Sequence, residues 1–420
     1  MYRKEQLDNG LRLVTNAMPG RSSLSLGIWI RTGGRYETAQ NKGISHFLEH
    51  LVFKGTAKYS CRQIKESIEG IGGSLNGFTS EELTCYLVKI PADYMGRALD
   101  ILSQMVVNPS IPAQEVEKEK HVILEELKMY KDLPQAYVYD LLDELLWPGH
   151  PLGSPVIGTA ESVSAVTRAT LRSFQQRFYN PANIVVSAAG NLDHAKLRAQ
   201  VKKTFSHIPE NDRSAFAPAS CRQGKPQVKV FVKDTEQTHM ALGFSSFRRE
   251  HPLRHALAML HIILGANMSS RLFNEIREKR GLAYEIGTAV KRFQDTGAFI
   301  VHAGIDNRKV HEALKLIIKE LAKIRSAFVT EDEFRRAKDF YIGQLRMALE
   351  DTMEHMLWIG ESVAALDKIK TLNEIVKEVS AVRRQDIREA AAQIFDSRKI
   401  NLALIGPLKG RESAFLKELG

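Results

Sequence analysis

The sequence predicts an α+β protein of two similar domains, each an antiparallel or mixed sheet with helices packed on one face. The chain has 420 residues, which is too long for one ordinary core. Its two halves repeat each other, and each half mixes short strands with amphipathic helices. Intermixed helices and antiparallel strands are typical of a sheet that carries helices on one face.

The repeat has a spacing near 216 residues. A turn and helix, a late strand and an early strand all recur at an offset of 216, and one long helical stretch recurs at 218. A period this long indicates two similar domains and not a solenoid. The matching segments begin at Val163 and Val379, Asn183 and Lys399, Leu26 and Leu242, and Glu115 and Glu333. We expect a first domain at residues 1–208, a linker at 209–226 and a second domain at 227–420.

Hydrophobic periodicity predicts the elements of the first half. SLSLGIWIR alternates, with Leu24, Leu26, Ile28 and Ile30 on one face, and therefore predicts a half-buried strand. Further strands are expected at 83–90 and 183–190. Amphipathic helices are expected at 44–53, 61–71, 94–107, 113–130, 136–146 and 171–179.

Composition narrows the functional classes. The net charge is +10, but the basic residues are scattered among acidic ones, so a solvated basic surface is favoured over nucleic-acid binding. The three cysteines form no C-x-x-C pair, which fits a reducing compartment. The N-terminus is polar, and no stretch approaches the ~20 apolar residues of a membrane span. We therefore expect a cytoplasmic protein without membrane contact, although a mature form that had lost a targeting peptide would look the same.

The segment HFLEH places His46 and His50 four residues apart with Glu49 between them. On a helix these side chains share one face, so both imidazoles can reach one metal ion beside a carboxylate base. The alternative is a polar edge on a buried helix. The flanking residues are apolar, and burying two histidines and a glutamate without a partner would be costly.

A third ligand is expected from the helix at 113–130. Glu119 and Glu126 are two turns apart on a face that also carries apolar residues, whereas Glu125 shares its side with lysines and looks solvated. The pattern favours Glu126 as the ligand, with Glu119 orienting a histidine from behind.

The repeat offers an internal comparison. At an offset of 218, Gln344 stands where the first half has Glu126, and Ala337 where it has Glu119. The second half also has no counterpart of Glu49 and His50. If these acids served folding alone, the second copy should need them too, so their loss favours a chemical role in the first half.

These motifs resemble the pitrilysin/insulinase class of zinc metallopeptidases, the inverzincins. The likeness is greatest to the branch with the mitochondrial processing peptidase β-subunit and its bacterial homologues. The resemblance extends over nearly the whole chain, through GGRYE, KGISHFLEHLVFKGT, GGSLNGFTSEELT, EKEKHVILEEL and SSRLFNEIREKRGLAYEIG. It implies one zinc ion per chain, held by His46, His50 and Glu126, with Glu49 activating water and Glu119 supporting the site.

The resemblance also implies an assembly and further site residues. Members enclose peptides between two half-shells, and this chain would form one, so a homodimer or a pair with a related subunit is implied. Arg277 and Tyr284 match a pair that approaches the substrate carbonyl from the partner's second domain. Asn76, Gly77 and Phe78 match the edge strand to which a peptide adds. Gly77 stands where relatives often have alanine or another small residue, and its backbone freedom leaves the rigidity of the strand open. Glu81 stands where many relatives have arginine, so no substrate preference carries over.

The function implied is a zinc endopeptidase that cuts short or unfolded peptides by Glu-assisted attack of water. Two alternatives stay open: a non-catalytic structural or assembly subunit, and an active subunit that requires a distinct partner.

Overall fold

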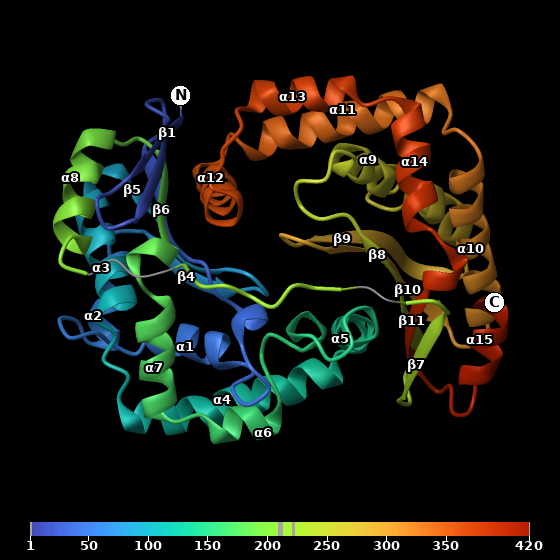
Figure 1. Ribbon diagram of the computed structural model, residues 1–420, viewed down its shortest axis with the longest axis horizontal. Coiled ribbons are helices and arrows are strands. Elements are labelled where there is room, and N and C mark those ends of the chain that lie inside the picture. The colour runs from blue at the N-terminus through green and yellow to red at the C-terminus, as the bar shows by residue number, and fades with distance from the viewer. Residues whose placement is uncertain (1, 209–212, 221–222, 420) are drawn as a thin grey trace. The chain divides into compact units, whose positions relative to one another are not determined.

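The computed structural model describes residues 2–208, 213–220 and 223–419, which form two compact units (Figure 1). The first unit comprises Met1–Lys128, Ser154–Ala217 and Arg346–Thr371. The second comprises Met129–Gly153, Pro218–Leu345 and Leu372–Gly420. The expected linker at 209–226 lies partly outside the described residues, as does Cys221. Within its described part the chain passes from the first unit to the second between Ala217 and Pro218.

The first unit is built on a six-stranded sheet with the order β1-β2-β6-β3-β5-β4. Strands β2 and β6 run parallel, and all other neighbours are antiparallel. The strands are β1 (Tyr2–Gln6), β2 (Arg12–Ala17), β3 (Ser23–Ile30), β4 (Ser74–Thr79), β5 (Thr84–Pro91) and β6 (Ile184–Gly190).

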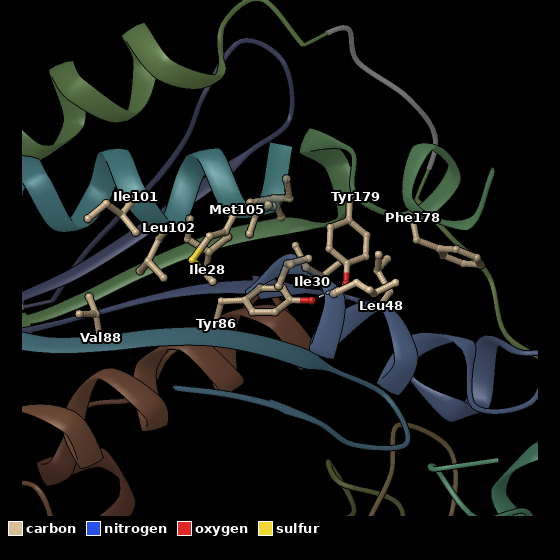
Figure 2. Close-up of a cluster of buried hydrophobic side chains, with 14 of the residues drawn as sticks. Ile28, Ile30, Leu48, Tyr86, Val88, Ile101, Leu102, Met105, Phe178 and Tyr179 are labelled. Atoms are coloured by element: carbon tan, nitrogen blue, oxygen red, sulfur yellow. Dashed lines mark hydrogen bonds between the residues drawn. The ribbon is translucent and has the colours of Figure 1, made fainter. Parts of the chain in front are cut away.

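One face of this sheet carries most of the unit's helices. Leu48 from one helix, Ile101, Leu102 and Met105 from another, and Ile28 and Val88 from the strands pack together in its core (Figure 2). The Tyr86 and Tyr179 hydroxyls hydrogen-bond to each other at 2.7 Å within this core. The helices are α1 (Ile44–Val52), α2 (Cys61–Glu69), α3 (Met95–Val107), α4 (Ala113–Asp132, whose last turn belongs to the second unit), α6 (Ala160–Ala165), α7 (Arg168–Phe178) and α8 (His194–Phe205).

The opposite face is covered by α12 (Thr352–Leu366), which comes from the C-terminal half of the chain (Figure 1). Ile359 and Val363 pack with Trp29 and Val185 in a separate cluster. Strand β3 is therefore buried on both faces, and the expectation that it is half-buried was wrong, because Trp29 on the second face is only 2% exposed. Alternation alone could not reveal a helix supplied from more than 300 residues away.

The second unit repeats this plan on a five-stranded sheet with the order β7-β11-β8-β10-β9. This order matches β2-β6-β3-β5-β4 strand for strand, including the parallel pair β7 and β11. The strands are β7 (Gln227–Val232), β8 (Gln237–Ser246), β9 (Ala283–Arg292), β10 (Gly297–Asp306) and β11 (Asn401–Gly406). The helices are α5 (Pro134–Leu146), α9 (Arg254–Leu264), α10 (Val310–Ser326), α11 (Glu331–Ala348, whose last residues belong to the first unit), α13 (Leu372–Ala381), α14 (Arg384–Ile394) and α15 (Glu412–Leu419).

Here α5 plays the part that α12 plays in the first unit. Val138, Leu141 and Leu142 of α5 pack on Ala241 and Ile300 of the sheet, on the face opposite α9 and α14. Since α5 starts at Pro134 and α12 at Thr352, the two helices are equivalent in the repeat at an offset of 218. Each half thus contributes one helix to the sheet of the other, and a linear division at 208 and 227 misassigns these two segments.

The α+β class with two similar domains is confirmed, and the helix on the second face of each sheet is the feature that was not expected. The helices expected near 44–53, 61–71, 94–107, 113–130, 136–146 and 171–179 all occur, with ends shifted by up to three residues. None of the helices in the described ranges has both the length and the apolar character of a membrane span.

Candidate metal centre

Helix α1 is held at its start by a buried carboxylate. Glu37 accepts hydrogen bonds from the backbone N–H groups of Gly43, at 2.7 Å, and Ser45, at 2.9 Å. An acceptor at this end satisfies orphan donors and matches the positive end of the helix dipole. Burial raises the pKa of Glu37 to about 7, against the lowering effect of these donors. Gly43 has φ +84°, and a Cβ there would lie 2.4 Å from the Ile157 carbonyl oxygen, so the turn into α1 requires glycine.

The buried face of α1 fixes how its polar edge is presented. Phe47, Leu48 and Leu51 have no exposed surface and pack into the core. The helix period then leaves His46 and His50 side by side on the other face, with ring centroids 4.6 Å apart. The apolar residues that made the motif conspicuous are therefore the ones that aim it.

Three side chains converge at this edge. In the described part of the chain, His46, His50 and Glu126 form the one group of three or more histidines, cysteines or carboxylates with ligand atoms all within 4.8 Å of one another. Glu126 Oε2 lies 3.9 Å from His46 Nε2 and 3.7 Å from His50 Nε2. Both distances are too long for hydrogen bonds. They are short enough for one ion, since two ligands each ~2.1 Å from zinc are at most ~4.2 Å apart.

The electrostatics of these groups suit a divalent cation. Burial lowers the pKa of His46 to about 4, assisted by His50, so its imidazole is neutral near pH 7. A neutral imidazole is the form that binds metal. Burial also raises the pKa of Glu126, although His50 works against the shift. Two imidazoles and one carboxylate are a common donor set for catalytic zinc, so the residues present fit this metal.

Glu119 lies behind the metal edge and contacts His50. Its Oε2 is 3.1 Å from His50 Nδ1, and the residue is only 3% exposed. The contact joins the nitrogen of His50 that faces away from Glu126, as expected for a carboxylate that orients a ligand. Lys54, directly after α1, places its Nζ 2.6 Å from the other oxygen, Oε1.

Glu49 is held by a residue of the neighbouring strand. The Thr79 hydroxyl at the end of β4 donates to Glu49 Oε2 at 2.7 Å. Burial raises the pKa of Glu49; Thr79 and His50 oppose the rise, and Glu126 adds to it. A carboxylate with a raised pKa is a better proton acceptor than an exposed one.

Strand β4 lies at the end of the sheet order, and its exposed and half-buried residues alternate. Asn76 folds back, so that its Oδ1 accepts from the Gly77 N–H at 2.8 Å. Phe78 packs edge-to-face on Trp29, with ring centroids 5.7 Å apart. A Cβ on Gly77 would lie 3.1 Å from the Phe53 ring, so glycine here allows close packing against the residue directly after α1.

The second unit brings Arg277 and Tyr284 together. Arg277 lies in a π-helical segment, Phe273–Glu278, and Tyr284 near the start of β9. The guanidinium carbon lies 5.4 Å from the centroid of the Tyr284 ring and 4.8 Å from that of Phe273. Tyr284 is 74% exposed. An aromatic side chain this exposed is available to a ligand, and π-helical turns often occur at functional sites.

The sequence patterns do not predict the contacts of three residues beside the site: Glu37, Lys54 and Thr79. They lie in the segments GGRYE, VFKGT and SLNGFTS. Periodicity ranks residues by burial, but it does not indicate which side chain a neighbour will contact. A threonine or lysine beside a motif carries no signal of its own in a single sequence.

The chain is similar to known proteins over nearly its whole length. Residues 12–160 match the family described as Insulinase (Peptidase family M16), and residues 165–341 match the one described as Peptidase M16 inactive domain. An uncharacterised zinc protease of Streptomyces coelicolor is 36% identical over 99% of this chain and 92% of its own length. One from Bacillus subtilis is 35% identical over 97% of this chain and 98% of its own.

Solved structures show the same fold. A protease from Helicobacter pylori matches with a TM-score of 0.92 at 22% identity, covering 97% of this chain and 99% of that one. A peptidase M16 inactive domain from Pseudomonas fluorescens matches with a TM-score of 0.90 at 19% identity, covering 97% and 98%.

Proposed function

Since the chain belongs to the insulinase (M16) peptidase family, we propose that it is a zinc-dependent endopeptidase acting on short or unfolded peptides. The observation that carries the proposal is the convergence of His46, His50 and Glu126 beside the half-buried carboxylate of Glu49. The relatives' description as zinc proteases supports the choice of metal.

The metal ligands in this proposal are the two histidines and Glu126. Zinc, when bound, supplies Lewis acidity that polarises a water or a carbonyl oxygen. The chain's own contribution is to keep His46 neutral through burial and to aim His50 through Glu119. One zinc ion is expected per chain, because the described part of the second unit offers no comparable group of side chains.

Glu49 is the general base. It accepts a proton from the water that attacks the scissile carbonyl carbon, and it passes that proton to the amine nitrogen as the C–N bond breaks. Thr79 holds Oε2 by its hydrogen bond, which leaves Oε1 to take the proton. The proton given to the leaving amine is the one removed from water, so Glu49 ends each cycle as it began.

The peptide is proposed to add to β4 as a further strand. An edge strand offers unpaired backbone groups to an extended peptide. Because these hydrogen bonds involve only the peptide backbone, the binding depends little on the peptide's sequence. Asn76, Gly77 and Phe78 line this edge. Arg277 and Tyr284 are assigned to the carbonyl oxygen of the substrate, where an arginine and a hydroxyl would stabilise developing negative charge. They would come from a second copy of the chain, which completes a chamber of two half-shells.

The test is Glu49→Gln, measured on the purified full chain with a mixture of unstructured peptides. Wild type should bind one zinc and cut peptides. The variant should keep the zinc but lose at least ~100-fold in cleavage rate, since general bases contribute about that much. Glu69→Gln, on the exposed end of α2, is the matched control and should cut normally.

Full activity in Glu49→Gln would refute the assigned role. A wild-type chain with neither zinc nor cleavage would instead favour a structural or assembly subunit. Sizing of the same sample separates a homodimer from a chain that needs a distinct partner: an active peak at twice 47.2 kDa supports the homodimer.

A further inference from the structure

Lys54 is the one described cation that contacts the carboxylate behind His50. Its Nζ lies 2.6 Å from Glu119 Oε1, while Glu119 Oε2 lies 3.1 Å from His50 Nδ1. Each oxygen of the carboxylate thus has its own partner, one on each side. Glu119 is 3% exposed, so solvent does little to orient it.

The contact with Glu119 determines which ring nitrogen of His50 carries a lone pair toward Glu126 and the ion. An ionised carboxylate only accepts hydrogen bonds, so His50 Nδ1 must carry the proton and donate it. The neutral ring then has its lone pair on Nε2, the atom 3.7 Å from Glu126 Oε2. If Glu119 turned away, neither the tautomer nor the ring orientation would be fixed.

We infer that Lys54 is a positioning residue of the metal centre, which holds the Glu119 carboxylate in the orientation that presents His50 Nε2 to the ion. The inference rests on the proposed zinc site. Lys54 completes a chain of three contacting residues: a lysine from the loop after α1, the Glu119 carboxylate from α4 and the ligand His50 from α1. The same ion pair joins the end of α1 to α4, the helix that supplies Glu126 two turns further on.

A purely electrostatic role for Lys54 predicts the opposite sign. A positive charge near a cation site weakens cation binding, so its removal would tighten zinc binding. Positioning outweighs repulsion here, because the Lys54 charge is paired with Glu119. Its removal would leave one oxygen of a buried carboxylate without a partner, and such groups reorient to recover one. Loss of an outer partner typically weakens metal binding 10- to 100-fold.

The experiment measures the zinc dissociation constant of the full chain by competition with a chromophoric chelator. Lys54→Met keeps an unbranched chain of similar bulk and removes the charged amine; we expect zinc to bind about 10-fold or more weakly. Lys54→Arg restores a donor and should stay within about threefold of wild type. The matched control is Lys58→Met, four residues along, which loses a 2.6 Å ion pair to Asp100 and should leave zinc binding unchanged.

A double variant tests whether Lys54 acts through Glu119. In a Glu119→Gln background, Lys54→Met should add little further loss, because the two residues belong to one chain of contacts. Lys54→Gln, a second neutral variant, serves if Lys54→Met is unstable without metal, as judged by its unfolding midpoint.

Unchanged or tighter zinc binding in the neutral variants overturns the inference and leaves the proposed function standing. Additive losses in the double variant overturn it as well. If wild type itself binds no zinc, the proposed function fails and this inference falls with it.

Discussion

Glu125 and Glu126 are adjacent in sequence, but their side chains differ in exposure and in their contacts. The side chain of Glu125 is 71% exposed and pairs with Lys128 on the outer side of α4. The side chain of Glu126 is 25% exposed and faces His46 and His50. The helix period separates neighbours by about 100°, so adjacent glutamates point to different sides of α4. Of the apolar residues near Glu126, Ile123 is buried, whereas Val122 and Tyr130 are exposed.

Zinc binding should distinguish the two glutamates. Glu126→Gln copies the residue found at the equivalent position of the second half, and it should weaken zinc binding more than about 100-fold, because a ligand is lost. Glu125→Gln should bind zinc like wild type. The measurement is the zinc content after dialysis against a weak chelator. Equal zinc in both variants would remove Glu126 from the site.

Gly77 affects β4 both through its backbone freedom and through its packing. Its added backbone freedom puts the rigidity of β4 in question. The tertiary structure gives a reason for glycine at this position, because a Cβ would lie 3.1 Å from the Phe53 ring. A contact between the end of α1 and β4 depends on how the helix sits on the sheet, and no local pattern encodes it.

At the scale of elements, the packing of α12 on the first sheet depends on close approach. On α12, Gly360 faces the sheet, and a Cβ there would lie 2.1 Å from Trp29 Nε1 and 2.6 Å from Ser187 Oγ. Trp29 also donates to Ser187 Oγ at 2.9 Å, which keeps the indole in place. The helix can therefore approach the sheet only because a side chain is missing at this position.

Gly360→Ala should destabilise the protein. The gain of up to ~1 kcal/mol in helix propensity is outweighed by overpacking of about 1–3 kcal/mol. Gly343→Ala is the matched control on α11, where a Cβ meets nothing within 4 Å, and it should be neutral or stabilising. Urea unfolding of both variants makes the comparison. If Gly360→Ala were stabilised as Gly343→Ala is, the close packing of α12 on β3 would be disproved.

At the scale of the whole molecule, the two units share the order of five strands, but within the residues that the structure describes only the first unit brings together a group of possible metal ligands. Ala337 is buried at the place of Glu119, and Gln344 is exposed at the place of Glu126. The scaffold thus folds without the acids, which supports a chemical reason for them in the first unit.

Strand addition to β4 predicts a preference for unfolded substrates. A small disulfide-bonded protein should be cut at least ~100-fold faster after reduction and alkylation than in its native form, because a stable native state leaves little chain extended. Cleavage is followed by mass spectrometry, with Glu49→Gln as the blank. Equal rates on both forms would contradict an edge-strand mode of binding.

The sequence by itself determined the two-domain repeat, the α+β class, most helices of the first half, and the set of His46, His50 and Glu126. The helices follow from periodicity, since burial of apolar residues at intervals of two or 3.6 is a local constraint. The repeat follows from matching segments at an offset near 216, and the three residues from the spacing of HFLEH, the face of the helix at 113–130 and the family resemblance. The tertiary structure alone decided that α5 and α12 each pack on the sheet formed by the other half of the chain, and that β3 is buried on both faces. It also decided that Glu37 contacts the start of α1, that Thr79 contacts Glu49, and that Lys54 contacts Glu119. These depend on which distant surfaces meet, and a sheet face has no local mark that names the helix that covers it.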